Sequence, residues 1–219
     1  MKIISLVNFM RGGKSSLARL LAEKMETSIL NFDPKRNAEF YNAVPTNNIP
    51  EDAKIIRNDD SIKVISKINT MTITSNKDMF ICDFGGRFDT RINEFQSDVY
   101  ILPMQYDFES INETIRATKY ILSENENAFI IHVLNMYGCN SKKKRDTFKI
   151  DYEELIILNK LKDIPYHIMP SSELIAKIIN NKMKISDIVG NSNFLKKGAY
   201  KNILTFVSEL IETINRREK

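Results

Sequence analysis

The sequence contains no tryptophan, only two cysteines and no long apolar run. Cys82 and Cys139 lie in no metal or redox spacing, which argues against a disulfide scaffold and a cysteine-rich metal site. No stretch approaches the roughly eighteen apolar residues that cross a bilayer, and the first residues lack the features of a signal peptide, so we expect a cytoplasmic protein. Repeats, low-complexity tracts and long Pro/Gly-rich linkers are also missing, and we expect one domain over residues 1–219.

The composition is that of an ordinary globular protein with a mild excess of positive charge. Of the 219 residues, 42% are hydrophobic and 27% are charged, which suffices for one sizeable core. The net charge of +4 is compatible with a polyanionic partner but does not demonstrate one. Basic residues form two groups in the second half of the chain. Each group is either a solvated surface or a phosphate-binding patch. The first group is residues 142–145, and the second contains Lys196, Lys197, Lys201, Arg216 and Arg217.

Short apolar runs alternate with helical patterns along the chain. The runs predict buried strands at residues 2–7, 27–32, 79–82, 98–103, 128–134 and 166–169. The helical patterns fall at residues 15–25, 61–70, 108–123, 152–161, 174–180 and 201–216. Residues 43–60 and 138–149 are the least regular. Alternation with hydrophobic strands predicts an α/β fold with a mostly parallel sheet and helices on both faces, that is, a three-layer sandwich that binds ligands at the carboxyl ends of its strands.

A phosphate-binding loop follows the first predicted strand. Residues 8–15 fit the pattern G-x-x-x-x-G-K-[ST] except that Asn8 replaces the first glycine. Asparagine tolerates left-handed backbone angles better than most residues. Because a strand precedes the loop and an amphipathic helix follows it, backbone N–H groups and the positive helix end are expected to converge on a bound phosphate.

Each remaining position of the loop has an expected role in nucleotide binding. Gly12 and Gly13 let the backbone approach the phosphates. Lys14 neutralises the β- and γ-phosphate oxygens, while the Ser15 hydroxyl binds Mg²⁺, which prefers hard oxygen ligands. Ser16 adds a contact to the α-phosphate. These residues predict a P-loop domain of the ATP-hydrolysing kind.

Two aspartates follow other predicted strands and complete the candidate site. Asp83 ends the run MFIC, which is the position of an acidic residue that holds Mg²⁺ directly or through water. Asp33 stands before Pro34 and is suited to orienting or deprotonating the attacking water. Both aspartates also have a purely structural interpretation as turn or cap residues, and for Asp33 the Asp-Pro turn is an equal alternative.

With these segments in order, the chain resembles the ParA/MinD family of deviant Walker A ATPases, which partition plasmids and chromosomes or position cell machinery. FMRGGKSS stands in place of the family's glycine-rich loop, NFDPKRNA resembles its second motif and ICDFGG resembles its aspartate motif. DVYILPMQYDFESI is similar to the next strand and turn. The resemblance implies that Asn135, in HVLNMYG, contacts adenine and that Pro170, in HIMPSS, lies near the same base.

The chain departs from the family at its defining lysine near the start of the loop. Phe9 stands there, and Arg11 is the nearest cation, so Arg11 is the candidate replacement on the phosphates. Asn31 replaces the first acidic residue of the second motif, which leaves Asp33 as the water-positioning carboxylate.

The resemblance implies a slow, partner-stimulated ATPase that uses ATP and Mg²⁺ and dimerises when ATP is bound. The dimer is expected to bind DNA without sequence preference, in association with the nucleoid, through Lys196, Lys197, Lys201, Arg216 and Arg217, or alternatively through residues 142–145. A centromere-binding or adaptor protein is the expected stimulating partner. No guanine-specific N/T-K-x-D motif is present, so ATP is preferred over GTP mainly through the resemblance.

Two other functions remain open at this stage. The apolar residues of the stretch 201–216 are compatible with a MinD-like membrane anchor, although a terminal amphipathic helix more often packs on its own domain. The missing lysine is compatible with an ATP-binding scaffold that hardly hydrolyses its nucleotide. His132 and His167 lie in apolar runs without a metal-ligand pattern, and we expect structural roles for them.

Overall fold

The structure is a computed structural model of the chain. It describes residues 1–8, 12–33, 44–74, 77–85, 89, 91–171, 175 and 194–216, without the side chains of Glu94 and of residues 194–197. The strands are β1 (Lys2–Leu6), β2 (Ser28–Asn31), β3 (Thr46–Asn48), β4 (Lys54–Arg57), β5 (Ser61–Ile65), β6 (Thr70–Thr74), β7 (Met79–Asp83), β8 (Val99–Gln105), β9 (Ile130–Asn135) and β10 (Tyr166–Met169). The helices are α1 (Lys14–Met25), α2 (Arg91–Phe95), α3 (Phe108–Glu124), α4 (Lys142–Leu158) and α6 (Phe194–Arg216).

Seven parallel strands form the central sheet, in the order β10-β9-β8-β1-β7-β2-β3. All six runs predicted to be strands lie in it. Their residues are apolar throughout because both faces of the sheet are covered, and every residue of β9 is buried. The strand order in the sheet places β7 between β1 and β2, although about fifty residues separate β2 from β7 in the sequence. The segments that follow these three parallel strands therefore leave the sheet side by side.

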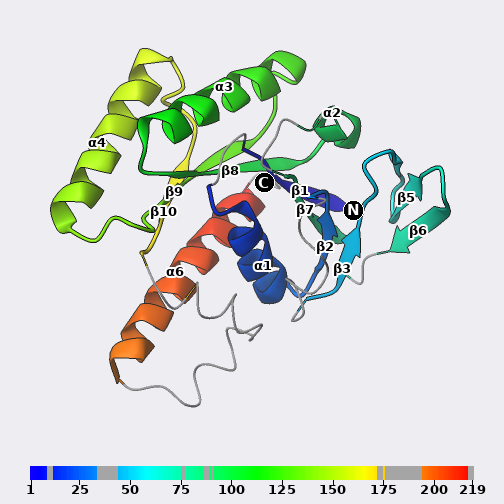
Figure 1. Cartoon of the computed structure of the whole chain (residues 1–219), viewed down its shortest axis with the longest axis horizontal. Helices are drawn as coiled ribbons and strands as arrows, with labels where there is room; N and C mark the ends of the chain where they lie inside the picture. The colour runs from blue at the N-terminus through cyan, green and yellow to red at the C-terminus, as the bar shows by residue number, and fades with distance from the viewer. Residues whose placement is uncertain are drawn as a thin grey trace.

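Helices cover both faces of this sheet, as predicted (Figure 1). Neighbouring residues of β1 show the division: Ile4 packs in a cluster with α1 and α6, whereas Ile3 packs in a cluster with α2 and α3. Helix α4 joins α3 over β8 and β9 in a third cluster. The described part of the chain is therefore a three-layer α/β sandwich.

A second, three-stranded antiparallel sheet lies beside the main one, in the order β4-β5-β6. The predicted helix at residues 61–70 is wrong, because β5 and the start of β6 occupy it. Ile62 and Val64 are buried while Lys63 between them is exposed, which is the period of two of a half-buried strand. Branched residues in this segment pack well on a pleated sheet, and Ile62 and Ile65, three residues apart, also fit a helical spacing.

Two predicted helices begin earlier in the structure than in the sequence analysis. Helix α4 begins at Lys142 rather than at residue 152, because Ser141 caps it by accepting a hydrogen bond from the Lys144 N–H at 3.2 Å. Its first turns carry few buried residues, and the apolar pattern there is correspondingly weak. Helix α6 begins at Phe194 rather than at residue 201. The helix predicted at 174–180 lies almost wholly outside the described residues.

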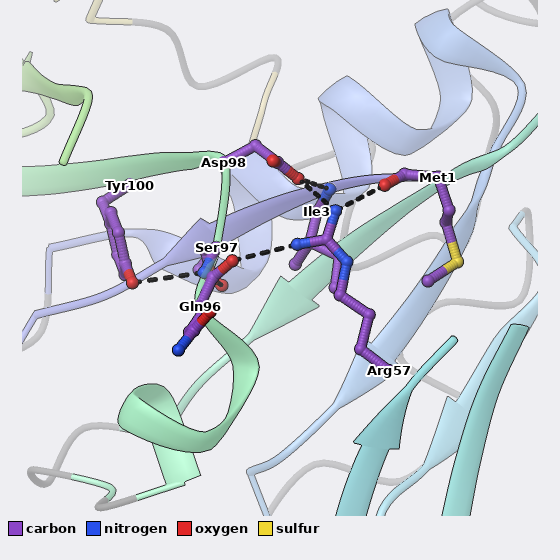
Figure 2. Close-up of polar contacts among 8 residues, drawn as sticks. Met1, Ile3, Arg57, Gln96, Ser97, Asp98 and Tyr100 are labelled. Atoms are coloured by element: carbon purple, nitrogen blue, oxygen red, sulfur yellow. Dashed lines mark hydrogen bonds and ion pairs between the residues drawn. The ribbon is translucent and has the colours of Figure 1, made fainter. Parts of the chain in front are cut away.

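Arg57 attaches the small sheet to the side of the central sheet where its strands begin, which we call the amino edge (Figure 2). Its guanidinium donates to the Met1 carbonyl at 2.6 Å, the Gln96 carbonyl at 3.0 Å and the Asp98 carboxylate at 2.9 Å. Asp98 also accepts from the Ile3 N–H at 2.7 Å. One side chain therefore joins β4, the end of α2, the start of β8 and the start of β1.

The amphipathic helix α6 packs on its own domain. Ile203, Val207, Leu210 and Ile214 are fully buried in the core cluster that contains α1 and the sheet. This burial uses the apolar face on which the membrane-anchor alternative depended. Within the part of the chain that the structure describes, no helix has the length and apolar character needed to span a membrane.

Candidate nucleotide site

The predicted motifs lie together at the side of the central sheet where its strands end, which we call the carboxyl edge. Leu6, at the end of β1, pairs with Asp83 at the end of β7, and Asp83 pairs in turn with Asn31 at the end of β2. The phosphate loop leaves from β1, while Asp33 lies two residues beyond β2. The strand order alone therefore brings Lys14 and both aspartates to one edge, as expected of ligand sites in parallel sheets.

The two glycines of the loop are required by the local geometry. Gly13 caps α1 with φ at +89°, a left-handed conformation that glycine adopts without strain. A Cβ atom on Gly12 would lie only 1.8 Å from the Pro103 carbonyl oxygen of β8. The loop backbone thus packs directly against the neighbouring strand, and the N-cap residue of α1, Gly13, has no side chain to accept from the first N–H groups of the helix.

Lys14 lies inside the loop rather than in solvent. Lys14 is only 7% exposed, and its ammonium group donates to the Asn8 carbonyl oxygen at 3.1 Å. A buried ammonium group needs such partners because desolvation of the charge is costly. The lysine is therefore already held near the backbone that would surround a phosphate. The sequence motif predicted a lysine in the loop but not its contact with the Asn8 carbonyl.

Asn8 has a positioning role that the sequence did not reveal. Its side-chain amide donates to the Pro103 carbonyl at 2.5 Å and to the Thr114 hydroxyl of α3 at 3.1 Å. Asn8 is 2% exposed. The residue that replaces the first glycine of the motif therefore fastens the start of the loop to β8 and α3. Arg11, the candidate replacement for the family lysine, lies outside the described residues.

The two aspartates differ in exposure. Asp83 is fully buried, whereas Asp33 is half-buried. A Cβ atom on Gly85 would lie 3.7 Å from the Asp33 carboxyl carbon, so Asp33 packs against the segment that follows Asp83. Asp33 also donates its backbone N–H to the Asn31 side-chain oxygen at 3.1 Å. The Asn31 side chain closes this turn, whereas the Asp-Pro turn weighed for Asp33 involves Pro34, which lies outside the described residues.

Residues predicted near the base lie on the other side of the loop. Asn135, at the end of β9, donates its amide to the Gly12 carbonyl at 3.1 Å and accepts from the Tyr137 N–H at 3.0 Å. It is 3% exposed, so in this structure it supports the loop backbone. Pro170 follows β10 and is half-buried. Their contact with adenine stays a prediction.

The oxygen groups at this edge fit a magnesium ion. Ser15 and Ser16 are half-buried in the first turn of α1, and the Asp83 carboxylate lies at the end of the strand next to β1. Mg²⁺ is usually held by one or two such oxygens together with phosphate and water, rather than by a cage of carboxylates. Among the described residues no group of three His, Cys, Asp or Glu side chains forms such a cage.

The histidines have structural roles, as predicted. His132 is fully buried and lies within hydrogen-bonding distance of the Thr118 hydroxyl at 2.8 Å and the Tyr152 hydroxyl at 2.9 Å. Burial lowers its pKa to about 3, so the ring is neutral at physiological pH. His167 bonds to the Thr213 hydroxyl at 2.9 Å, and burial lowers its pKa as well.

The candidate DNA-binding residues are only partly described. Lys201 is exposed on α6, and Arg216 forms an exposed ion pair with Glu212 at 2.8 Å. The side chains of Lys196 and Lys197 and the whole of Arg217 lie outside the description. In the alternative patch, the lysines at 142–144 are exposed in the first turn of α4.

No protein-family model matches the sequence, and no curated protein matches it significantly. Solved structures do match. The McdA(D38A)–ATP complex of Cyanothece superposes with a TM-score of 0.62 at 12% identity, over 98% of this chain and 96% of that chain. The septum site-determining protein MinD of Pyrococcus horikoshii with Mg-ADP gives 0.58 at 14% identity, over 95% of each chain.

A putative plasmid partition protein of Borrelia burgdorferi bound to AMPPNP gives a TM-score of 0.55 at 17% identity, over 95% of this chain and 98% of that chain. At these identities the likeness establishes the fold. The structural neighbours of this chain are thus ParA/MinD-type partition and positioning ATPases, and the P-loop α/β fold predicted from its motifs is confirmed.

Proposed function

We propose that this chain binds ATP and Mg²⁺ at the carboxyl edge of its central sheet and hydrolyses the nucleotide. The observation that carries the proposal is the convergence at one edge of a glycine loop with its buried lysine and of two aspartates from neighbouring strands. The neighbouring structures with ATP, Mg-ADP and AMPPNP support a nucleotide as the ligand.

Each residue has a role that follows from its position. Lys14 would exchange the Asn8 carbonyl for phosphate oxygens, and the N–H groups at the start of α1 would bind the same phosphates. Ser15 and Asp83 would hold Mg²⁺, which neutralises phosphate charge. Asp33 would orient the attacking water. Phosphoryl transfer depends on positioning and on charge neutralisation, and these groups would supply both.

The larger role that we propose is a partition or positioning switch. In this scheme ATP closes a homodimer, with Arg11 in place of the family lysine. The dimer binds DNA through exposed basic residues such as Lys201, and hydrolysis stimulated by a partner protein releases it. Contacts to phosphate predict DNA binding that weakens steeply with salt. The fold shared with partition proteins supports this scheme.

The test measures ATP hydrolysis and DNA binding together, with ATP, ADP or no nucleotide, across a salt series. Wild-type protein is expected to bind DNA only with ATP, Lys14→Ala to lose this binding, and Asp33→Ala to bind but not hydrolyse. Arg11→Ala tests the replacement of the lysine. Tight ATP binding without turnover would indicate a scaffold instead. Nucleotide binding without DNA binding would overturn the DNA part, and liposome sedimentation would then test membranes.

A further inference from the structure

A cluster of aromatic rings joins the segments that carry the two aspartates. Phe32 precedes Asp33, and Phe84 follows Asp83. Their rings stack with centroids 4.4 Å apart, and Phe95 of α2 packs edge-on against both, at 5.2 and 6.2 Å. All three side chains are essentially fully buried. The ends of β2 and β7 are therefore packed together beyond their last backbone hydrogen bonds.

Arg91, at the start of α2, lies against this cluster. Its guanidinium carbon is 5.0 Å from the centre of the Phe32 ring, and its Nη2 approaches the Phe32 carbonyl oxygen at 3.5 Å. Nη1 donates to the Pro50 carbonyl at 2.7 Å. Arg91 thus contacts both the ring and the backbone of the residue before Asp33, and it fixes that backbone to the loop between β3 and β4.

Asp89 fixes the orientation of the Arg91 fork. One carboxylate oxygen accepts from Nε at 2.8 Å and the other accepts from Nη2 at 2.6 Å. The Arg91 backbone N–H also donates to Asp89 at 3.0 Å. The side chains are only 11% and 14% exposed, so solvent screens this bidentate pair weakly. A lysine has the charge but not the planar fork, and it cannot reproduce these contacts together.

We propose that Arg91 is a positioning residue, which sets where the Asp33 carboxylate lies relative to the segment that follows Asp83. This inference rests on the proposed function, because it assumes that Asp33 acts on a nucleotide. In this proposal Arg91 acts through Phe32 and Pro50 rather than by contacting the nucleotide. Its loss is therefore expected to change the rate of hydrolysis more than the affinity for ATP.

Arg57 provides the matched control. It also joins α2 to the β3–β4 region through main-chain carbonyls and one aspartate, but it does so at the amino edge (Figure 2). Arg57→Lys removes a comparable set of contacts, one of them to Gln96 directly after this helix, without touching Phe32. A general loosening of α2 would affect both variants alike, whereas positioning of Asp33 concerns Arg91 alone.

The experiment compares wild type, Arg91→Lys and Arg57→Lys at a temperature where all three are folded. Dissociation constants for ATP with Mg²⁺ and single-turnover hydrolysis rates are measured. For Arg91→Lys we expect a rate loss of about 10- to 100-fold with the affinity within about threefold, because a misplacement near 1 Å costs that much in rate. Arg57→Lys is expected to keep both values. Equal rates in the two variants would overturn the inference.

Amide hydrogen exchange gives a second measurement that does not need turnover. In Arg91→Lys the amides of Phe32 and Asp33 should exchange faster, while those of Ile3 and Asp98 keep their wild-type rates. In Arg57→Lys the pattern should be reversed. Unchanged exchange at Phe32 and Asp33 would overturn the inference even in a protein that does not hydrolyse ATP. Failure of wild type to bind ATP at all would instead overturn the proposed function.

Discussion

The two edges of the central sheet hold their cations in different ways. At the amino edge, Arg57 donates to three groups from two distant parts of the chain, Met1 and the segment 96–98. At the carboxyl edge, Lys14 donates to Asn8, a carbonyl six residues earlier in its own loop. Loss of the Arg57 contacts would weaken the link between the small sheet and the amino edge, whereas a phosphate can replace the Asn8 carbonyl as an acceptor for the Lys14 ammonium group. The amino edge is thus suited to holding the fold together, and the carboxyl edge to binding an anion.

The backbone shows the same difference. Gly12 packs against Pro103, and Gly13 has a left-handed conformation, so the carboxyl edge depends on two positions that only glycine fills well. At the amino edge ordinary side chains hold the backbone in place: the Tyr100 hydroxyl accepts from the Ser97 N–H at 3.2 Å. Substitutions at the amino edge should therefore lower stability without changing nucleotide binding, whereas those at the carboxyl edge should change nucleotide binding.

The largest effect is expected for Gly12→Ala, at the carboxyl edge. The added methyl group would lie 1.8 Å from the Pro103 oxygen, which is main chain and cannot move aside easily. We expect a loss of about 3 kcal/mol or more in the free energy of unfolding, together with loss of ATP binding, because the loop must shift. Chemical denaturation and ATP titration measure both. Wild-type stability and affinity in this variant would contradict the described packing of the loop.

The second prediction concerns His132, which lies between the two edges and has a structural role. Its pKa is lowered from 6.5 to about 3 in the folded protein, so below pH 6.5 the unfolded state takes up a proton that the folded state does not. Stability should fall with pH in that window by about 1.4 kcal/mol per pH unit and level off below pH 3. In His132→Gln this part of the slope should vanish. An unchanged difference between pH 7 and pH 5 would contradict burial of a neutral imidazole.

Arg57→Ala is the amino-edge counterpart. It removes two bonds to carbonyls and an ion pair whose side chains are 29% and 39% exposed, so screening reduces the contribution of the pair. We expect a loss of about 1–2 kcal/mol in unfolding free energy and an unchanged affinity for ATP. Urea unfolding and ATP titration check this. A weakened ATP affinity in a folded protein would break the separation of the two edges.

The smallest effect is expected for Gly198→Ala, a control away from both edges. Gly198 lies in α6, and apart from the backbone of its own helix and its chain neighbours no atom of the described residues lies within 4 Å of the position that its Cβ would take. Alanine lowers the entropy cost of forming a helix, so the variant should be more stable by about 0.5–1 kcal/mol. A thermal melt is sufficient. Destabilisation would show that the helix makes a close contact there.

The central sheet was predictable because its strands are continuous apolar runs, which buried parallel strands require. The place of the glycine loop and of both aspartates at the carboxyl edge was predictable because each directly follows such a run. The small sheet was missed because Ile62, Val64 and Ile65 are compatible with a helical spacing as well as with alternation. Short apolar segments do not distinguish the two.

The supporting contacts were not predictable from the sequence. Asn8 is 95 residues from Pro103, and Asn135 is 123 residues from Gly12, so only the folded sheet brings these pairs together. Arg91 likewise lies 59 residues from Phe32. A sequence motif indicates which atoms meet the ligand, whereas the groups that hold those atoms in place come from any part of the fold.

The most direct test of a nucleotide site at the carboxyl edge is calorimetric titration of ATP with Mg²⁺ into wild type, Lys14→Ala and Lys2→Ala. Lys2 is the matched control, since its ammonium group donates to the Ile214 carbonyl at 3.1 Å at the other end of β1. We predict that Lys14→Ala weakens binding by about 10- to 150-fold, the loss of a charge-assisted hydrogen bond of about 1.5–3 kcal/mol. Lys2→Ala should bind as wild type does. Equal affinity of wild type and Lys14→Ala, or no binding by wild type, would contradict the proposed site.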